Sequence, residues 1–502
     1  MKYLLLIGLV VISLQSSAKK LPNVIVVVAD DIGLGDVSYY RSQHTSNVIV
    51  KTPNIDQLAK TGMAFTDAHS PAALCAPSRY AIMTGKHCYR SPFPWGVWGA
   101  YEKSPINDDD LTLGKLMKQA GYATGFFGKW HLGGDFRRKD DSSKVYRGPR
   151  YKPELDVDIR QSVGGNPLHN GFDYSFTYPA GIQDVPYAVY ENGQWMPLQK
   201  DSEISYVSQQ KMDKIGVKLD KSEGLGDSNW DPHQMGPLLV DKAIGFIEKK
   251  ATGHRPFFMY YCSQAVHLPH TPCDSLGGTA VKGSYANKHM DMIKELDVQI
   301  GMLIESLKHN QIHDNTIIIF TSDNGGLTFA ETLKHGHQPS DIYRGGKNQI
   351  YEGGHRVPFI VNWPGVIKAN SHCDEPVLAL DIMATLAAIT NSHIPAHKGI
   401  DSHNLLPLLK NEKQAVGHSY LLVQGGTGKE VAIINDGWKL IIQIDKRDKT
   451  DNTRMPIALF NLNESPSEQS VNNLIDNDEH EEKVKHLFNK YNQLRDKKAA
   501  MN

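Results

Sequence analysis

Short apolar runs rich in β-branched and aromatic residues recur along the chain, and segments with helical spacing separate them. The runs occupy residues 24–29, 123–127, 257–261, 316–320 and 359–361. Continuous apolar strands joined by long helical crossovers are typical of a parallel sheet covered on both faces. Apolar residues at helical spacing predict covering helices over 290–308 and 381–390. We therefore expect a large α/β domain whose central sheet is mostly parallel and flanked by helices.

The pattern changes after about residue 409. Runs at 420–423, 431–434 and 438–442 are separated by glycine-containing and charged turns, which predicts a small antiparallel sheet. Residues 479–498 are predicted to form an amphipathic closing helix. The predicted organisation is a large domain over 19–409 and a small C-terminal α+β domain over 410–502.

Residues 1–18 have the pattern of a secretory signal peptide. Lys2 precedes an apolar stretch over 4–14, and the small residues Ser16 and Ala18 mark a cleavage site. We therefore expect an exported protein, periplasmic or secreted. Later segments are too short or too polar to cross a bilayer, and 54 basic against 55 acidic residues give no field that favours nucleic acid. Neither a membrane nor a nucleic acid is expected as a partner.

Charged, imidazole or amide side chains follow four of the predicted strands. They are Asp30 and Asp31, Lys129 and His131, His267, and Asp323 and Asn324. Any one of them is also typical of a turn or a helix cap. Because ligands bind beyond the carboxyl ends of parallel strands, four strands that end this way favour a common site. In extended backbone, Lys129 and His131 would face the same side.

The carboxylates and the amide form a hard, oxygen-rich set. Asp30, Asp31, Asp323 and Asn324 suit Ca²⁺, with Mg²⁺ as the alternative, rather than a soft metal.

Residues 75–85 read Cys-Ala-Pro-Ser-Arg-Tyr-Ala-Ile-Met-Thr-Gly. Proline is tolerated in a first helical turn, so a helix is predicted to start near Cys75, where free backbone N–H groups attract anions. Arg79, one turn on, offers a planar fork of donors to an oxyanion. The alternative is a buried structural cysteine with an ordinary ion pair. A second segment, Arg344-Gly-Gly-Lys347, allows close backbone approach at its glycines, and its alternative is a plain surface turn.

The 75–85 run resembles the maturation signature of the type I sulfatases, Cys-x-Pro-Ser-Arg followed by Thr-Gly. The resemblance continues at 23–31, 52–56, 128–133, 264–267, 322–326 and 459–466. It implies an alkaline phosphatase-like fold and a cysteine, Cys75, that a formylglycine-generating maturation enzyme oxidises. The aldehyde hydrate would then be the nucleophile of a sulfate-ester hydrolase. In a binuclear zinc phosphatase of the same superfamily, histidines would be expected among the metal ligands, so Asn324 favours a single calcium.

The resemblance also implies a role for each site residue. Asp30, Asp31, Asp323 and Asn324 would hold calcium together with the modified Cys75. Arg79 and Lys129 would steady the hydrate, and Lys347 would bind sulfate oxygens. His267 would protonate the departing alcohol, and His131 would help to deprotonate the hydrate. Lys86, where the family commonly has arginine, and the segment 135–235 depart from the family pattern.

The expected substrate is a sulfated glycan. Aromatic residues in the loop 93–98 suit sugar rings, although they equally suit a core. The basic residues between 137 and 152 suit a polyanion, or a solvated loop. His335 and His337, which lie near Lys347 in the sequence, could line a sugar pocket. A glycosaminoglycan such as chondroitin or dermatan sulfate is preferred over an algal galactan.

Two other functions are compatible with this pattern. A phosphate or phosphonate ester hydrolase of the same superfamily would share the Cys75 signature. An exported glycan-binding protein on a decayed sulfatase fold is less favoured, because no metal-binding or cationic residue is missing. The four other cysteines, Cys88, Cys262, Cys273 and Cys373, would allow zero, one or two disulfide bridges in an oxidising compartment.

Overall fold

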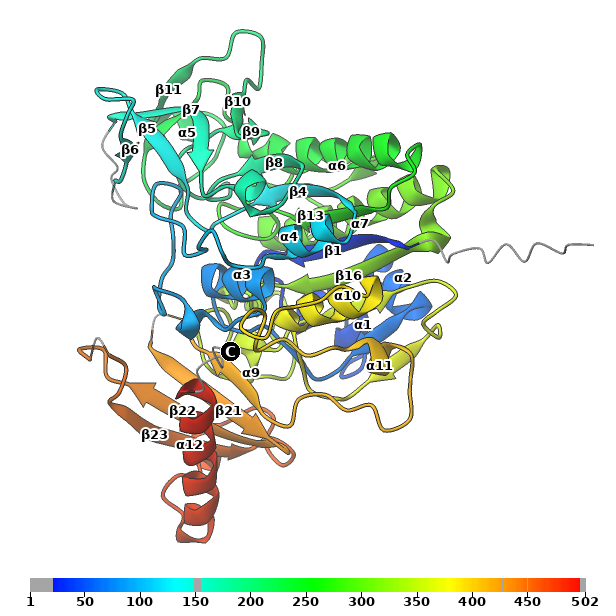
Figure 1. Ribbon diagram of the computed structural model, residues 1–502, viewed down its shortest axis with the longest axis vertical. Coiled ribbons are helices and arrows are strands. Elements are labelled where there is room, and N and C mark those ends of the chain that lie inside the picture. Colours follow the sequence, from blue (N-terminus) through cyan, green and yellow to red (C-terminus); the bar gives the residue numbers. More distant parts are fainter. Residues whose placement is uncertain (1–20, 149–154, 427, 449, 497–502) are drawn as a thin grey trace, which may run out of the picture.

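The computed structural model describes residues 21–148, 155–426, 428–448 and 450–496 (Figure 1). The predicted signal peptide, residues 1–18, lies outside the described residues.

A 13-stranded sheet forms the centre of the large α/β region. Its middle strands run parallel to one another in the order β16, β1, β13, β4 and β8. Their bounds are Thr316–Ser322, Asn23–Ala29, Phe257–Cys262, Ala123–Lys129 and Tyr174–Tyr178. The mostly parallel central sheet is thus confirmed, and β1, β4, β13 and β16 are buried along their whole length.

Further strands, most of them in antiparallel pairs, extend the sheet at both edges. Beyond β16 lie β17 (Phe359–Asn362), β2 (Met63–Phe65) and β18 (Ser371–Cys373). Beyond β8 lie β9 (Val189–Glu191), β10 (Gln194–Met196), β7 (Val157–Gly164), β5 (Asp135–Arg138) and β6 (Val145–Tyr146).

The strand predicted at 359–361 exists but runs antiparallel to β16, so its expected direction was wrong. The residues between β16 and β17, all of them described, contain only the short helices α8 (Ala330–Lys334) and α9 (Glu352–His355). Without a long crossover helix the chain stays at the carboxyl edge of β16 and returns in the opposite direction.

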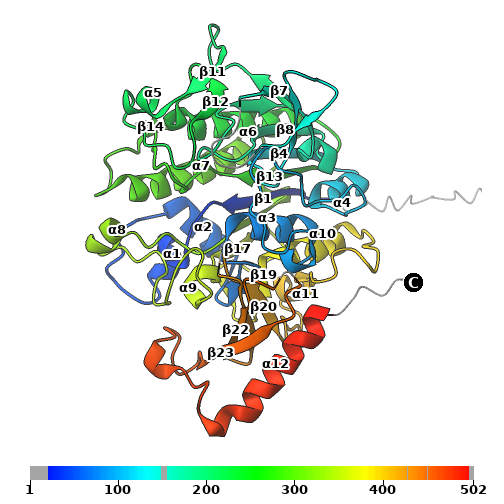
Figure 2. The same cartoon turned by 90° about the vertical axis from the view of Figure 1, so that its left-hand side faces the viewer.

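Helices cover both faces of the sheet (Figures 1 and 2). One face carries α1 (Ser38–Arg41), α2 (Pro53–Thr61), α6 (Met235–Ala251) and α7 (Lys288–His309). The other carries α3 (Cys75–Thr84), α4 (Leu113–Gln119), α10 (Ile382–Thr390) and α11 (Leu406–Leu409). The helices predicted over 290–308 and 381–390 correspond to α7 and α10. Alternate residues of β1 enter separate cores, Ile25 and Val27 on one side and Val24 and Val26 on the other.

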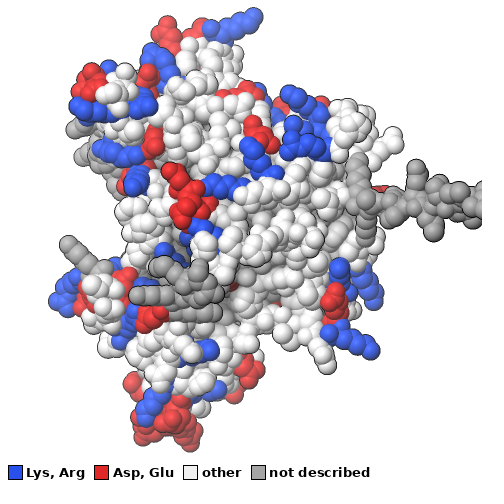
Figure 3. All heavy atoms as spheres, viewed as in Figure 1, with Lys and Arg blue, Asp and Glu red and all other residues white. Residues whose placement is uncertain are grey.

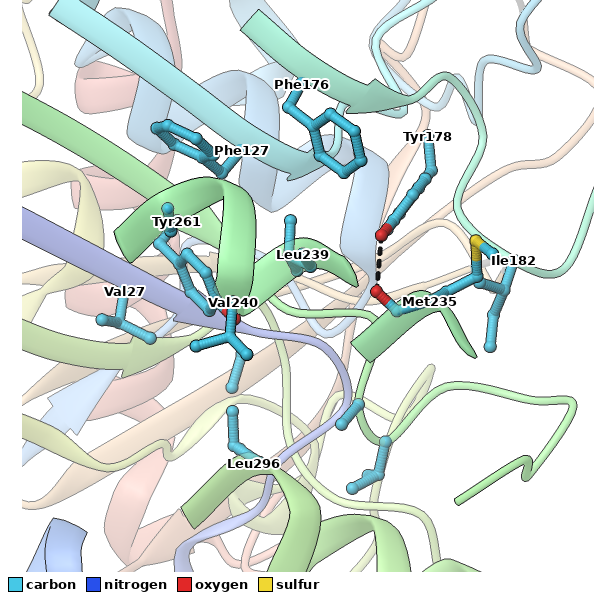
Figure 4. Close-up of a cluster of buried hydrophobic side chains, with 14 of the residues drawn as sticks. Val27, Phe127, Phe176, Tyr178, Ile182, Met235, Leu239, Val240, Tyr261 and Leu296 are labelled. Carbon is cyan, nitrogen blue, oxygen red and sulfur yellow. Dashed lines mark hydrogen bonds between the residues drawn. The ribbon is translucent and has the colours of Figure 1, made fainter. Parts of the chain in front are cut away.

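Buried hydrophobic side chains lie between β1 and the covering helices (Figure 4). Val27 of β1 belongs to the same buried cluster as Val240 of α6 and Leu296 of α7. Each such side chain contributes roughly 1.5–3 kcal/mol when it is fully buried. The Tyr178 hydroxyl at the end of β8 also donates to the Met235 carbonyl oxygen at 2.6 Å, which joins the start of α6 to the carboxyl edge of the sheet.

The remaining elements are short. They are the strand pairs β3 (Ala68–His69) with β19 (Val377–Leu378), β11 (Ile204–Val207) with β12 (Gly224–Asp227), and β14 (Ser275–Leu276) with β15 (Thr279–Ala280), and the helix α5 (Gln209–Asp213). Single 3₁₀ turns occupy Leu34–Asp36, Cys88–Arg90, Pro167–Asn170, Pro232–Gln234, His313–Asn315, Ala379–Asp381, Ser470–Asn472 and Asp478–His480.

The C-terminal region contains a second sheet, as predicted. Its antiparallel strands are β20 (Leu421–Gln424), β21 (Glu430–Asn435), β22 (Trp438–Ile444) and β23 (Arg454–Asn461). The closing helix α12 (Glu481–Asp496) packs Leu487 and Tyr491 against this sheet; the predicted helix end at 497–498 lies outside the described residues. The domain boundary between 409 and 410 stays a prediction.

All five cysteines are described, buried and unpaired. None of the disulfide bridges that the sequence left open is therefore formed. Within the described part of the chain, no helix combines the length and the apolar character needed to span a membrane.

His87, in the loop after α3, is expected to make folding stability depend on pH. Its ring is buried and stacks on Tyr89, with ring centres 5.2 Å apart. Burial lowers the pKa of His87 from 6.5 to about 4, although Asp401 acts in the opposite direction. Between these values the unfolded chain binds a proton at His87 that the folded chain does not, so stability falls as the pH falls.

His87→Phe keeps a ring at this position and removes the titration. Between pH 7 and pH 5, the loss of unfolding free energy in urea is expected to be about 2 kcal/mol smaller than for the unsubstituted chain. The exposed His372, substituted by phenylalanine in the same way, serves as the control. Equal losses in His87→Phe and the unsubstituted chain would contradict the prediction.

Candidate active site

The predicted site residues converge at the carboxyl edge of the parallel strands. This edge lies at the left in Figure 1 and faces the viewer in Figure 2. The strands β1, β4, β13 and β16 deliver their following residues here, as predicted. Cys75 arrives at the start of α3, and Lys347 arrives in the connection between β16 and β17.

One half of the site is a buried network of two cations and two carboxylates. Lys129 Nζ donates to Asp30 Oδ2 at 2.6 Å, and both side chains are fully buried. Arg79 Nε and Nη2 lie 2.9 and 2.7 Å from Asp323 Oδ2. Arg79 Nη1 also donates to the Lys129 carbonyl oxygen at 3.1 Å. The arginine of the 75–85 run thereby joins the ends of β4 and β16.

Asp31 is the centre of the other half. Lys347 Nζ donates to its carboxylate at 2.7 Å, and Asn324 Nδ2 donates to Oδ1 at 3.0 Å. His267 Nε2 lies 3.8 Å from Asp31 Oδ2. The other ring nitrogen of His267, Nδ1, lies 2.8 Å from the Leu268 carbonyl oxygen, and a hydrogen bond to this oxygen orients Nε2 towards Asp31.

Cys75 is the first residue of α3, as the sequence predicted. Its Sγ lies 3.5 Å from His131 Nδ1. Ser78 fixes the preceding segment, because its hydroxyl donates to the Ala72 carbonyl oxygen at 2.7 Å and accepts from the Ala72 N–H at 3.1 Å. Gly85 ends the helix with a left-handed φ of 63°, which favours glycine. Residues 75–85 thus form a short helix with its C-terminal cap, and this helix places Cys75 at its N-terminus.

Two site residues have strained backbone. Asp31 and His131 have φ values of 65° and 55°, a left-handed conformation that costs on the order of 1 kcal/mol or more outside glycine. The expectation of extended backbone from Lys129 to His131 was therefore wrong. Gly128 precedes this turn with φ 95°, and a Cβ there would lie 1.8 Å from the Cys262 carbonyl oxygen. Packing against β13 thus allows only glycine before Lys129.

The negative charges of the carboxylates repel one another. Burial raises the pKa of Asp323 to about 7; Arg79 acts against this rise, whereas Asp30 and Asp31 add to it. For Asp30, the cations led by Lys129 outweigh burial and hold its pKa well below the usual range. Burial, Lys129 and Lys347 together lower the pKa of His267 to about 4. A divalent cation among the three carboxylates would relieve their mutual repulsion.

Two buried oxygen atoms fit such a cation. Asp30 Oδ1 and Asn324 Oδ1 accept no hydrogen bond from the described residues. Carboxylate and amide oxygens are the ligands that Ca²⁺ and Mg²⁺ prefer. Atoms of Asp30, Asp31 and His267 lie within 4.8 Å of one another. The residues present therefore fit a hard divalent ion.

A second group of histidines and a carboxylate, His69, Glu352 and His355, has metal-like spacing. Lys439 Nζ lies 3.0 Å from both Glu352 Oε1 and His355 Nε2. The ammonium group thus supplies the positive charge in this cluster, which we interpret as a structural ion network.

In the loop 93–98 and the basic segment, several of the side chains expected to contact a glycan are buried or ion-paired. Trp98 is buried in the core, whereas Phe93 is exposed. In the basic segment, Arg138 pairs with Asp156 and Lys144 with Asp141. Residues 150 and 152 of this segment lie outside the described part. Lys86, which departs from the family pattern, pairs with Asp110 away from the site.

The charged side chains on the face shown in Figure 3 are mixed in sign. Where charged side chains gather on this face, lysines and arginines lie close to aspartates and glutamates, in keeping with the near-equal totals of 54 and 55. The described residues of this face therefore form no extended cationic track for a polyanion.

Sequence reasoning missed two histidines near the site. His270 and His289 line a cavity next to Leu268, whereas His335 is exposed and His337 is buried against Asp36. The short spacing from His267 to His270 was a signal for the first. His289 is brought to the site only by the packing of α7.

The comparisons with known proteins agree with this geometry. The family model described as Sulfatase matches residues 22–392. The chain belongs to the sulfatase family. This sulfatase is accordingly a sulfuric ester hydrolase with the α/β fold of its family. A second model, described as the C-terminal part of N-sulphoglucosamine sulphohydrolase, matches residues 345–497.

Individual relatives are similar over most of the sulfatase. It is 32% identical to an N-acetylgalactosamine-6-O-sulfatase of Bacteroides thetaiotaomicron, covering 91% of this chain and 90% of the relative. It is 28% identical to the human N-acetylgalactosamine-6-sulfatase, covering 78% and 67%. A solved Bacteroides thetaiotaomicron structure, described under the metabolism of multiple glycosaminoglycans, has a TM-score of 0.79 and 29% identity. It covers 95% of this chain and 100% of its own.

Proposed function

We propose that this sulfatase is exported and hydrolyses sulfate esters of a sulfated glycan, with a glycosaminoglycan preferred over an algal galactan. Its catalytic domain would span 19–409 and its small domain 410–502. The observation that carries the proposal is the position of Cys75 at the start of α3 beside His131. The similarity to an N-acetylgalactosamine-6-O-sulfatase supports a sugar sulfate.

Cys75 is proposed to be oxidised to formylglycine by a maturation enzyme of the host. The hydrated aldehyde would supply a nucleophile that no encoded side chain provides. The surroundings of Cys75 support this role, because the positive charges of Arg79 and Lys347 both lie close enough to interact with a negative charge at position 75. These cations and the N-terminal dipole of α3 would stabilise negative charge at this position.

Asp30, Asp31, Asp323 and Asn324 are proposed to hold Ca²⁺, with Mg²⁺ as the alternative. The ion would supply positive charge to the sulfate group during its transfer. Lys129 and Arg79 would keep the metal-binding carboxylates and the modified Cys75 in place. Lys347, whose side chain is less deeply buried than that of Lys129, would contact sulfate oxygens.

The two histidines are proposed to transfer protons at different groups, His131 at the modified residue 75 and His267 at the departing alcohol. His131, 3.5 Å from Cys75 Sγ, would accept a proton from the modified residue. His267 would protonate the departing alcohol oxygen through Nε2, which its contact with Leu268 orients. A bound sulfate ester adds negative charge near His267, which favours the protonated ring that a general acid requires.

The deciding experiment measures sulfate release from a panel of sulfated oligosaccharides and intact polymers. The protein is produced with a maturation enzyme, and aldehyde at position 75 is confirmed by mass spectrometry. Metal-stripped protein and protein reloaded with Ca²⁺ or Mg²⁺ are compared, and matched phosphate esters test the rival activity. Release that depends on Cys75 and on metal would support the proposal. Turnover of phosphate but not sulfate esters, or no turnover at all, would overturn it.

Replacing His267 by alanine is expected to reduce turnover of sugar sulfates more than turnover of aryl sulfates. A sugar alkoxide needs a proton to depart, whereas a phenolate leaves without help, and a general acid contributes roughly 10²–10⁴-fold. The measurement is kcat/KM of the variant on one substrate of each kind. His254→Ala, at an exposed position before β13, is the matched control. Equal losses on both substrates would contradict the general-acid role.

A further inference from the structure

A cavity of about 640 Å³ borders the catalytic cluster at the edge that faces the viewer in Figure 2. Its walls come from the loop after β13, the start of α7 and the segment around α8, and they include Leu268, His270, Asn287, His289, Phe329 and Thr332. Leu268 also receives the hydrogen bond of His267. The cavity volume lies within the range of ligand pockets, roughly 300–1,000 Å³.

Three rings form one corner of this cavity. The centres of the His270 and His289 rings are 5.0 Å apart. Phe329 approaches both rings edge-on, at 5.4 Å from His270 and 6.0 Å from His289. Together with Leu268, the phenylalanine makes this corner apolar except for the imidazole nitrogens.

Each imidazole has a buried nitrogen without a partner. Nε2 of His270 and Nε2 of His289 make no hydrogen bond with any described residue. His289 is only 2% exposed. A buried polar group left unpaired costs about 1–3 kcal/mol, so a ligand group that reaches these atoms would recover this energy.

The two free nitrogens have opposite hydrogen-bonding character. The backbone of Val266 favours a proton on the His270 ring, and a neutral ring that carries this proton on Nδ1 leaves Nε2 as an acceptor. Asn287 Nδ2 donates to Thr332 Oγ1, and the hydroxyl proton is then directed to His289 Nδ1 at 3.2 Å. We assign the tautomer in which this hydroxyl donates to Nδ1, so that the proton of the neutral His289 ring lies on Nε2 and makes it a donor.

The rings are neutral at pH 7. Burial lowers the pKa of His270 to about 4 and that of His289 well below its ordinary value. Asp31 opposes these shifts without reversing them. A neutral pair of imidazoles beside an apolar wall suits an uncharged polar group with a methyl.

We propose that this cavity binds the acetamido group of an N-acetylhexosamine. The amide N–H would donate to His270 Nε2, the amide carbonyl oxygen would accept from His289 Nε2–H, and the methyl would pack on Phe329 and Leu268. The inference rests on the proposed sulfatase activity towards glycans. It favours a glycosaminoglycan substrate over a galactan, because galactose has a hydroxyl where the hexosamine has the acetamido group.

The test compares kcat/KM for N-acetylgalactosamine and galactose that both carry sulfate at O6. The unsubstituted enzyme is expected to prefer the acetamido sugar by about tenfold or more. His270→Phe and His289→Phe keep a ring and remove the nitrogens, and each is expected to lower this preference by about tenfold. Thr332→Val, which removes the hydroxyl that orients the His289 proton, is expected to lower it less. His335→Phe, at an exposed position outside the cavity, is the matched control.

An aryl sulfate separates failure of this inference from failure of the proposed function. A preference that is absent, or unchanged in all three cavity variants, would overturn the inference. Turnover of the aryl sulfate but of neither sugar would also overturn it while leaving the sulfatase activity intact. No turnover of any of the three substrates would overturn both the proposed function and this inference. Thermal unfolding of each variant confirms that a folded protein is being compared.

Discussion

Replacing Cys75 by alanine is expected to abolish sulfate release while leaving the fold intact. Loss of a covalent nucleophile lowers turnover by a factor on the order of 10⁴ or more. The fold should persist because the substitution removes only the small polar end of one buried side chain, which lies beside His131. The measurements are sulfate release from the preferred glycan and the midpoint of thermal unfolding.

Cys88 provides the matched control for this variant. It is also buried and unpaired, and it lies just beyond α3 in the same part of the fold. Cys88→Ala is expected to retain normal turnover. Normal turnover in Cys75→Ala would exclude a nucleophile at this position, whatever the behaviour of the control.

Replacing Lys439 by alanine is expected to lower the free energy of unfolding by about 3–5 kcal/mol. Lys439 belongs to β22 and is fully buried. Its Nζ lies 3.0 Å from Glu352 Oε1 and 2.8 Å from Glu468 Oε1, and both glutamates are fully buried. Removing the cation leaves Glu468 without this partner, and an uncompensated buried charge is strongly destabilising.

Two further variants separate charge from packing in this cluster. Lys439→Met retains the length of the side chain, and it is still expected to be strongly destabilised in urea unfolding. Lys242→Ala removes a half-exposed lysine that pairs with Glu191 at 2.9 Å, and it is expected to cost at most about 1 kcal/mol. If Lys439→Met has the same free energy of unfolding as the unsubstituted chain, the ion network contributes little to stability.

Much of the site was predictable because it follows from local sequence. Apolar strands that end in Asp30 and Asp31 or in Asp323 and Asn324 place those residues at one sheet edge whenever the strands are parallel. The helix start at Cys75 depends on residues within one turn. By contrast, the direction of β17 depends on the path of the connection that precedes it, and the left-handed backbone of His131 depends on packing around Gly128.

The cavity beside His267 could not be predicted from local sequence either. His270 is close to His267 in sequence, but His289 belongs to α7 and Phe329 follows β16. Nothing in the local pattern of α7 distinguishes His289 from a histidine in an ordinary amphipathic helix. Its significance comes from an unpaired buried nitrogen, which exists only after three separate segments have packed together.

The sequence by itself determined the α/β class, the positions of the main strands, the Cys75 helix start and the polar residues that follow the parallel strands at the carboxyl edge of the sheet. Each of these depends on side-chain periodicity or on neighbours along the chain. The tertiary structure alone decided the antiparallel sheet edges, the Lys439 ion network and the imidazole cavity. These features depend on burial and on contacts between residues that are distant in sequence, and burial sets the charge and hydrogen-bonding state of such groups.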